Sequence, residues 1–323
     1  MDPLGDRDKT TALHAFNAKS LWTSELEALL EAHKLDLIVH SLKDMPTQLP
    51  KGLELGAVFA REDPRDALVL KAGSLPANMG TGRKLGAEEI LKSLPAGSVI
   101  GTSSLRRSAQ LKRRFGHLVF RDVRGNVPTR LRKLDGGERV DGFRDTDDER
   151  REGEEREERP AYAALILAAA GLIRLGLGDR ITAYLSSKDG GVLHAVGQGA
   201  LGVEIREGDE KISGLLRGLG DWRTERACLA ERSVMRTLEG GCSVPIGVET
   251  EWEDGDILIM RAVVVSLDGS EAVEAEEKMV VKTKEYAEEF GVVVARMLVQ
   301  RGADNILEAI TLNRKTVAEQ GDA

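Results

Sequence analysis

Residues 98–115 read SVIGTSSLRRSAQLKRRF, and this stretch decides the expected fold. The apolar run SVIG (98–101) is typical of a short buried strand, and the residues after it have the composition of a basic helix. Ser103 or Ser104 can cap that helix, because a serine hydroxyl accepts hydrogen bonds from the amides of the first turn. A strand that leads directly into a helix indicates an α/β protein.

The same alternation of strand and helix recurs along the chain. LDLIVH (35–40) and LVFRDV (118–123) are strand-like runs, and VPTRLRKL (127–134) is a helical pattern whose first turn tolerates Pro128. We expect further helices and strands in the segments 21–34, 162–177 and 192–207. This alternation predicts largely parallel sheets from about residue 20 to residue 206, with ligand sites at the carboxyl ends of the strands.

The pattern changes after residue 220. A helix is expected at 221–239, followed by alternating strands that are joined by Asp-Gly turns, and then a final helix at 283–303. The expected strands are 243–252, 256–266 and 272–281. This arrangement predicts a separate α+β domain at the C-terminal end.

Composition excludes several classes of protein. With 323 residues and 41% hydrophobic content, the chain can bury a sizeable core in two or three domains. Its formal net charge of -8 disfavours nucleic acid as a partner, since duplex binding needs a basic face. No apolar run resembles a signal peptide or a membrane span, and two cysteines make no disulfide framework. We expect a cytoplasmic monomer that binds neither nucleic acid nor membrane.

One segment departs from the rest in charge. Residues 141–159 read DGFRDTDDERREGEEREER, and nearly every side chain is charged. Such a segment cannot bury a core face, so we predict a solvated insertion around residues 141–160.

Basic and polar side chains follow the ends of the expected strands. They are Lys43, Asp44, Ser103, Ser104, Arg106, Arg107, Arg124, Asn126, Arg130 and Arg174. Guanidinium groups and helix N-termini both favour carboxylates and phosphates, so these positions together predict a cleft for a polyanion. Taken one at a time, each arginine is also compatible with an ordinary surface position.

Other candidate residues have a simpler interpretation. Lys112, Arg113, Arg114 and Arg132 are expected on a solvated helix face. His40 and His194 stand next to apolar residues and are expected to be structural, since no spacing of cysteines or carboxylates near them resembles a metal site. We expect no metal.

The stretch LEGGCSVPIG (238–247) contains one of the two cysteines. Gly240 and Gly241 are typical of a helix stop, and Pro245 prevents the helix from restarting, so Cys242 is expected on an accessible loop. Cys228 lies inside the preceding helical pattern and is expected to be a small buried hydrophobic residue.

These motifs together resemble a known family. HSLKDMP (40–46), REDPRDAL (61–68), GTSSLRR (101–107) and VRGNVPTRL (123–131) occur in the order and approximate spacing of porphobilinogen deaminase, also called hydroxymethylbilane synthase. The motifs ILAAAGLIRLGL, AVGQGALGVE and LEGGCSVPIG continue the same order. Seven motifs in order are a far more specific signal than any one of them.

The resemblance implies a transferase that joins four porphobilinogen molecules, with loss of ammonia, into hydroxymethylbilane for tetrapyrrole and haem biosynthesis. It implies that Cys242 carries a dipyrromethane cofactor through a thioether. Lys43, Asp44, Ser104, Arg106, Arg107 and Arg124 match the positions that contact this cofactor. Arg106, Arg124, Arg130 and Arg174 match the positions that bind the carboxylates of the substrate. The resemblance gives Asp44 the central catalytic role, in which its carboxylate stabilises positive charge on pyrrole nitrogens, and it gives Lys43 an assisting role.

The resemblance also implies an architecture. Two domains similar to type II periplasmic binding proteins enclose a cleft, and a smaller α+β domain bears the cysteine loop. In this chain the first domain would comprise residues 1–60 and 200–217, the second 65–193 and the third 222–323. Gly197 and Gly199 stand at a crossing, where we expect backbone freedom to let the domains shift.

Two departures from the family keep alternatives open. Its members usually have an early strand and helix with the pattern Arg-x-Ser-x-Leu-Ala, which we expect this chain to lack, so we expect weak activity or none. The other departure is the insertion around 141–160. A catalytically silent module that binds polycarboxylates is therefore an alternative. Cysteine acyl transfer is a weaker one, because no histidine motif is suitably placed to activate Cys242.

Overall fold

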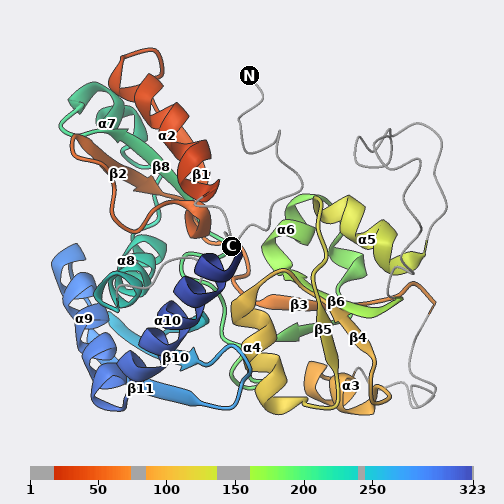
Figure 1. The fold of residues 1–323 in the computed structure, drawn as a ribbon. Helices are drawn as coiled ribbons and strands as arrows, with labels where there is room; N and C mark the ends of the chain where they lie inside the picture. Colours follow the sequence, from red (N-terminus) through yellow and green to blue (C-terminus); the bar gives the residue numbers. More distant parts are fainter. Residues whose placement is uncertain (1–17, 74–84, 137–160, 239–243, 322–323) are drawn as a thin grey trace, which may run out of the picture.

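The computed structural model describes residues 18–73, 85–136, 161–238 and 244–321. The strands within these ranges form three separate sheets, one from residues 38–58 and 201–206, one from 66–185 and one from 246–280 (Figure 1). The mixed α/β class expected from the sequence is confirmed.

The first sheet has the strand order β1-β8-β2. It consists of β1 (Ile38–Ser41), β8 (Leu201–Arg206) and β2 (Leu53–Val58), and both pairings are antiparallel. The helices α2 (Ala18–Glu31) and α7 (Glu210–Leu216) accompany it (Figure 1). Ile212 and Leu216 of α7 pack against Ala57 and Ile205 in the core of this unit.

The second sheet has the order β5-β4-β6-β3-β7. Its strands are β3 (Asp66–Leu70), β4 (Val99–Gly101), β5 (Val119–Arg121), β6 (Tyr162–Ala168) and β7 (Ala183–Leu185). Its helices are α3 (Ala87–Ser93), α4 (Leu105–Arg114), α5 (Val127–Asp135) and α6 (Ala169–Arg174), with a 3-10 turn, η3 (Gly178–Arg180). Leu68 faces the core shared with α3 and α4, whereas Ala67 and Val69 face the core shared with α5 and α6. Because both faces are covered, every residue of β3 is buried.

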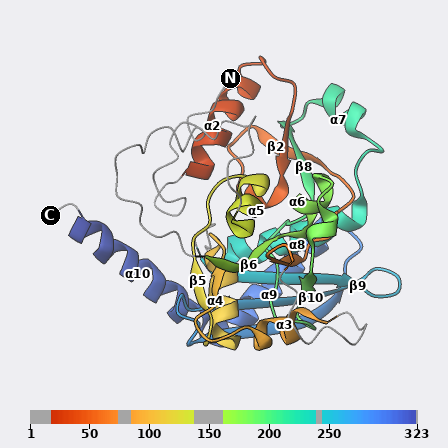
Figure 2. The ribbon, with the colours of Figure 1, turned by 90° about the vertical axis from the view of Figure 1, so that its right-hand side faces the viewer.

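The third sheet is an antiparallel meander with the order β11-β10-β9. It comprises β9 (Ile246–Trp252), β10 (Ile257–Val265) and β11 (Ala272–Val280), covered by α8 (Trp222–Thr237) and α9 (Lys284–Gln300). Gly255 and Gly269 have φ of 75° and 81°, which confirms the two Asp-Gly turns. The last helix, α10 (Ala303–Gly321), was not expected and runs outward from the body (Figure 2).

The expectation of largely parallel sheets is wrong. Only the β4–β5 and β4–β6 pairings are parallel among the described strands. The chain leaves the first sheet after β2, builds the whole second sheet, and returns as β8 between β1 and β2. Within the second sheet, β3 is antiparallel to both of its neighbours, β6 and β7, so even this sheet is mixed.

The two segments that cross between the sheets are hydrogen-bonded to each other. The amide of Phe59 donates to the carbonyl of Leu201 at 3.0 Å, and the amide of Glu62 donates to the carbonyl of Gly199 at 3.1 Å. Gly199 has φ of 86°, and a β-carbon there would lie 2.3 Å from the carbonyl oxygen of Glu62. Only glycine permits this approach.

The two helix starts that the sequence predicted near residues 104 and 127 are confirmed. Ser104 caps α4 by accepting from the amide of Arg107, and Asn126 caps α5 by accepting from the amide of Thr129. The solvated face predicted for α4 is wrong at Lys112, which is half-buried and donates to the carbonyl of Leu267 at 3.2 Å. The short elements β2, β3, β7, α3 and α7 and the 3-10 turns were not expected.

Candidate functional site

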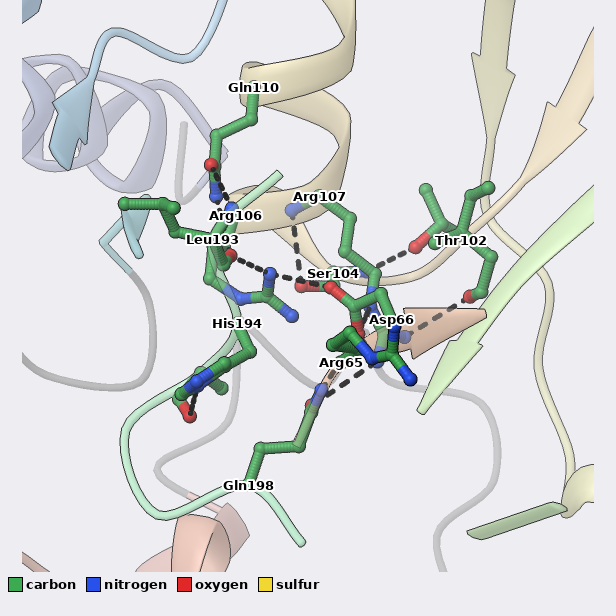
Figure 3. A network of polar contacts seen from close by, with 12 residues as sticks. Arg65, Asp66, Thr102, Ser104, Arg106, Arg107, Gln110, Leu193, His194 and Gln198 are labelled. Carbon is green, nitrogen blue, oxygen red and sulfur yellow. Dashed lines mark hydrogen bonds and ion pairs between the residues drawn. The ribbon is translucent and has the colours of Figure 1, made fainter. Parts of the chain in front are cut away.

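Asp66 is the centre of a buried ionic cluster in the second sheet (Figure 3). Its Oδ2 accepts from Arg106 Nη1 at 2.7 Å, and its Oδ1 accepts from Arg107 Nε at 2.9 Å and from Gln198 Nε2 at 2.9 Å. Asp66 is fully buried, and Arg106 and Arg107 are 6% and 7% exposed. Burial alone would raise the pKa of Asp66, but the charges and hydrogen bonds of Arg106 and Arg107 hold it well below its usual range.

The two arginines also bind carbonyl groups around this cluster. Arg106 Nη1 donates to the carbonyl of Leu193 at 2.5 Å, and Arg107 Nη1 donates to that of Ile166 at 3.1 Å. Burial lowers the pKa of Arg106, and the neighbouring charge of Arg107 acts in the same direction. One carboxylate therefore stands against two guanidinium groups, which leaves the cluster with a net positive charge.

That positive charge extends to the N-terminal end of α5. Burial lowers the pKa of Arg130, and the positive charges of Arg107 and Arg124 lower it further. Arg130 Nε donates to the carbonyl of Gly125 at 2.7 Å, in the turn before the helix. Arg107 and Arg124 thus lie close enough to repel the guanidinium of Arg130, which Asp122 only partly offsets, and a bound anion would relieve that repulsion.

Three consecutive residues between β7 and β8 bring other predicted site residues to this region. A β-carbon on Gly197 would lie 3.2 Å from the amide nitrogen of Lys43, Gln198 Oε1 accepts from Arg107 Nη2 at 3.4 Å, and the carbonyl of Gly199 accepts from Arg174 Nη2 at 2.7 Å. Lys43 and Asp44 are half-buried in η1 (Leu42–Asp44), directly after β1. The loop 197–199 therefore lies against η1, which follows β1 of the first sheet, and against α4 and α6, which cover the second sheet.

A second buried ion pair lies behind this loop. Arg61 Nη1 and Nη2 donate to the two carboxylate oxygens of Glu231 at 2.6 and 3.0 Å, and Arg61 Nε donates to the carbonyl of Gln198 at 2.8 Å. Glu231 also accepts from the amide of Gly197 at 2.8 Å and from Thr250 Oγ1 at 2.6 Å. Burial would raise the pKa of Glu231, but Arg61 outweighs it and the pKa falls to about 2.

The two histidines are buried, as their apolar neighbours predicted. His40 Nε2 lies 2.7 Å from Glu204 Oε2, inside the first sheet. Burial and the charge of Arg61 lower the pKa of His194 to about 4, and its Nδ1 lies 3.1 Å from the carbonyl oxygen of Ala195. Within the described ranges, no group of three His, Cys, Asp or Glu side chains could hold a metal ion.

One of the two cysteines, Cys228, lies within the described residues. Cys228 is fully buried in α8, and burial raises the pKa of its thiol to about 12, which confirms its interpretation as a small core residue. Cys242 and its loop lie outside the described residues, as does the acidic insertion at 141–160. In the part of the chain that the structure describes, no helix is both long and apolar enough to cross a membrane.

Sequence reasoning missed Asp66, Gln198 and the Arg61–Glu231 pair. Asp66 and Arg61 stand inside the motif REDPRDAL, and Gln198 stands inside AVGQGALGVE. One signal was available for Asp66, because a carboxylate beside the wholly apolar run ALVL can be buried only with a cationic partner. The identity of that partner depends on the tertiary fold.

Two family models match this chain. Residues 1–214 match the family model "Porphobilinogen deaminase, dipyromethane cofactor binding domain", and residues 225–300 match "Porphobilinogen deaminase, C-terminal domain". A solved structure, YhfZ from Shigella flexneri, has a TM-score of only 0.25 at 14% identity over 68% of this chain and 80% of that one, which is too weak to inform the fold.

Curated relatives share much of the sequence. The chain is 52% identical to porphobilinogen deaminase of Yarrowia lipolytica over 96% of this chain and 82% of that protein. It is 47% identical to the Neurospora crassa protein of that name, over 96% and 83%, and 45% identical to the Saccharomyces cerevisiae one, over 97% and 87%. On this evidence of sequence, the chain belongs to the porphobilinogen deaminase family.

Proposed function

We propose that this chain is a hydroxymethylbilane synthase, which joins four porphobilinogen molecules end to end and releases one ammonia per addition. The observation that supports it most directly is the group of guanidinium side chains in which Arg107 and Arg124 lower the pKa of Arg130. Each porphobilinogen has an acetate and a propionate side chain, so a growing oligopyrrole accumulates carboxylates. A partly buried site with excess guanidinium charge suits such a chain.

We assign the binding of carboxylates to Arg106, Arg124, Arg130 and Arg174. A charge-assisted hydrogen bond to a carboxylate contributes about 1.5–3 kcal/mol. Asp66 and the carbonyl of Leu193 fix one Nη atom of Arg106, and the carbonyl of Gly199 fixes one Nη atom of Arg174. Guanidinium groups held in this way lose little side-chain entropy when an anion binds.

The same cluster fits the family's dipyrromethane cofactor, which has carboxylate side chains of its own. Ser104, Arg106, Arg107 and Arg124 would hold these carboxylates, together with Lys43 and Asp44, and Cys242 would form the thioether. When bound, this group supplies the free pyrrole carbon to which the first substrate is joined. Several N–H groups of Arg107 already donate to Asp66, Ile166 and Gln198. Arg107 would therefore attract the cofactor carboxylates mainly by its charge and not by direct hydrogen bonds.

Asp44 is the residue to which we assign the central catalytic role. Loss of ammonia from the substrate leaves positive charge on its pyrrole nitrogen, and a half-buried carboxylate stabilises that charge better than water does. The carboxylate of Asp44 would also accept and return the proton of a pyrrole N–H. Lys43, next to it in η1, would bind a substrate carboxylate and favour the ionised form of Asp44.

The test is an assay of purified chain with porphobilinogen, following substrate consumption and formation of the linear tetrapyrrole. Asp44→Asn should lower the rate about two to three decades, because it removes one electrostatic stabiliser. Asp36→Asn is the matched control, since its side chain is 79% exposed at the start of the same segment. A wild-type chain that binds porphobilinogen without consuming it would be the silent polycarboxylate-binding module instead.

We also propose the division into domains and the solution state. Each described sheet falls inside one expected domain, with β1, β2 and β8 in 1–60 and 200–217, β3 to β7 in 65–193, and β9 to β11 in 222–323. This supports two domains of the type II periplasmic-binding kind and a third α+β domain. A cytoplasmic monomer is proposed as well, and sedimentation of the purified chain tests its oligomeric state.

A further inference from the structure

A basic cavity lies between α4 and the hairpin of β10 and β11, away from the Asp66 cluster. Its volume is about 300 Å³, and Arg113, Arg114, Arg261 and Arg301 are among its lining residues. Figure 1 shows α4 between the second and third sheets, where the hairpin reaches it. The turn between β10 and β11 packs closely against α4, because a β-carbon on Gly269 would lie 2.7 Å from the amide nitrogen of Arg113.

The carboxylates in the lining only partly balance these arginines. Arg113 pairs with Glu274, and Arg261 pairs with Glu276 at 3.0 Å. Both glutamates have side chains that are 59% exposed. Two carboxylates thus stand among four guanidinium groups in the lining, and exposed pairs of this kind contribute little, so an incoming anion can compete for the arginines.

The four arginines are not equivalent. Arg261 also contacts Glu249 at 3.3 Å and Glu251 at 3.5 Å, so much of its charge is already compensated. Arg301 donates to the backbone carbonyl of Glu274, which leaves its charge unneutralised by that contact.

Arg113 can exchange its exposed pair with Glu274 for an anion. Arg114 lies near one further carboxylate, Glu88, whose pKa is lowered first by Lys92 and to a smaller extent by the charge of Arg114. We therefore assign the anion to Arg113, Arg114 and Arg301.

Arg114 is seated against the wall of the cavity by a glycine. Gly191 has φ of 63°, and a β-carbon there would overlap the Cζ atom of Arg114, at 2.0 Å. A larger residue at position 191 would make this guanidinium shift, so Arg114 lies directly against the Gly191 backbone in the cavity wall.

The inner wall of the cavity is shared with the site described above. Gln110 is 3% exposed, donates from Nε2 to the carbonyl of Leu193 at 3.0 Å, and accepts at Oε1 from the amide of Leu193 at 2.8 Å. Arg106 Nη1 donates to the same carbonyl of Leu193. The cavity and the Asp66 cluster therefore meet at the Leu193 carbonyl, and Gln110, in the cavity lining, is one turn along α4 from Arg106.

We propose that this cavity is a second anion site, which binds a compact polyanion through Arg113, Arg114 and Arg301. Guanidinium forks bind phosphate and carboxylate groups in the same bidentate geometry, so the ligand class is a small polyphosphate or polycarboxylate. A volume of about 300 Å³ is at the lower end of small-molecule pockets, which favours a ligand with few atoms. The site is distinct from the arginines to which substrate binding is assigned.

Calorimetric titration of the full-length chain with inorganic pyrophosphate tests the proposal, at low ionic strength because salt screens such contacts. The substrate arginines also attract pyrophosphate, so two classes of site are expected. The double variant Arg113→Gln/Arg114→Gln should weaken one class at least about tenfold, as expected for lost charge-assisted bonds, and leave the other unchanged. Citrate in place of pyrophosphate then shows whether carboxylates suffice, and binding of either probe to this class supports the site.

The control variant removes the same charge elsewhere. Lys211→Gln/Arg217→Gln changes two basic residues of the α7 region, which do not line the cavity. Both classes of site should keep wild-type affinity in this control. Equal weakening in the two double variants would mean that only net charge matters, and that result would overturn the proposal. So would wild-type affinity in Arg113→Gln/Arg114→Gln.

Hydrogen exchange locates the bound anion without reference to activity. Pyrophosphate should slow amide exchange in peptides covering 105–114 and 191–196, because the occupied cavity holds α4 and the Leu193 segment together. The effect should be absent in Arg113→Gln/Arg114→Gln and retained in the control. Binding to the weakened class with no change of exchange in these peptides would place the anion elsewhere and refute the assignment.

Discussion

Arg61 and Glu231 form a bidentate ion pair, at 2.6 and 3.0 Å, between the first crossing segment and α8. The side chain of Glu231 is fully buried and that of Arg61 is 11% exposed. The same pair also bonds to Gly197 and Gln198, in the segment that leads from the second sheet back to β8, and to Thr250 of β9. One ion pair thus contacts segments that adjoin all three sheets.

Removing one partner of this pair should destabilise the protein strongly. Glu231→Gln leaves the guanidinium of Arg61 buried without a counter-charge, and we expect the free energy of unfolding to fall by about 3–5 kcal/mol. Urea denaturation measures the change. Glu251→Gln is the control, because that carboxylate is 50% exposed and its loss should cost about 1 kcal/mol or less. Equal losses in the two variants would mean that the buried pair has no special weight.

The pH dependence of stability should reflect His194. Its pKa is lowered to about 4, so between pH 6.5 and 4 the unfolded chain binds a proton there that the folded chain does not. Stability should therefore fall as pH falls through this window, by up to about 3 kcal/mol from this group. Glu231 adds a further loss of stability as pH falls from about 4.5 towards 2.

The variant His194→Asn isolates that contribution, since asparagine does not titrate. Unfolding free energies measured from pH 7 to pH 5 should change less with pH in His194→Asn than in the wild type. This upper window excludes most of the titration of the buried carboxylates. Parallel curves for the two proteins would contradict the assignment to His194.

Gly199→Ala should lower stability for two reasons, namely a steric clash of the new β-carbon and the strain of a positive φ. The new β-carbon would lie 2.3 Å from the carbonyl oxygen of Glu62, at a residue whose φ is 86°. Gly208 has φ of 73° with no atom within 4 Å of the corresponding position, so Gly208→Ala reports the backbone cost alone, about 1–2 kcal/mol. We expect Gly199→Ala to cost a further 1–3 kcal/mol or so from overpacking, measured by thermal unfolding.

The two cysteines should differ in cofactor attachment. Cys228→Ser should keep the added mass of a dipyrrole, because the thiol of Cys228 is buried and its pKa is raised to about 12, so it forms little thiolate. Cys242→Ser should lose that mass, as measured on the denatured whole protein by mass spectrometry. A dipyrrole retained by Cys242→Ser would refute the assignment.

Much of the local structure could be predicted because the signals are local. Ser104 and Asn126 cap helices through bonds to amides three residues away, and Asp-Gly turns need only a backbone that tolerates positive φ. The expectation of parallel sheets failed because periodicity shows that a strand exists but not which strand is its neighbour. The roles proposed for Lys43, Asp44 and the arginines rest on family motifs and stay predictions.

The sequence by itself determined the family, the α/β class, the main helices with their caps, and the presence of several arginines after strand ends. Tertiary structure alone decided which charges meet. Asp66 contacts Arg106 and Arg107 across about forty positions of chain, and Arg61 contacts Glu231 across a still longer separation. The physical reason is that burying a charge is costly unless a partner is brought to it, and only the folded chain places these partners, distant in sequence, within bonding distance.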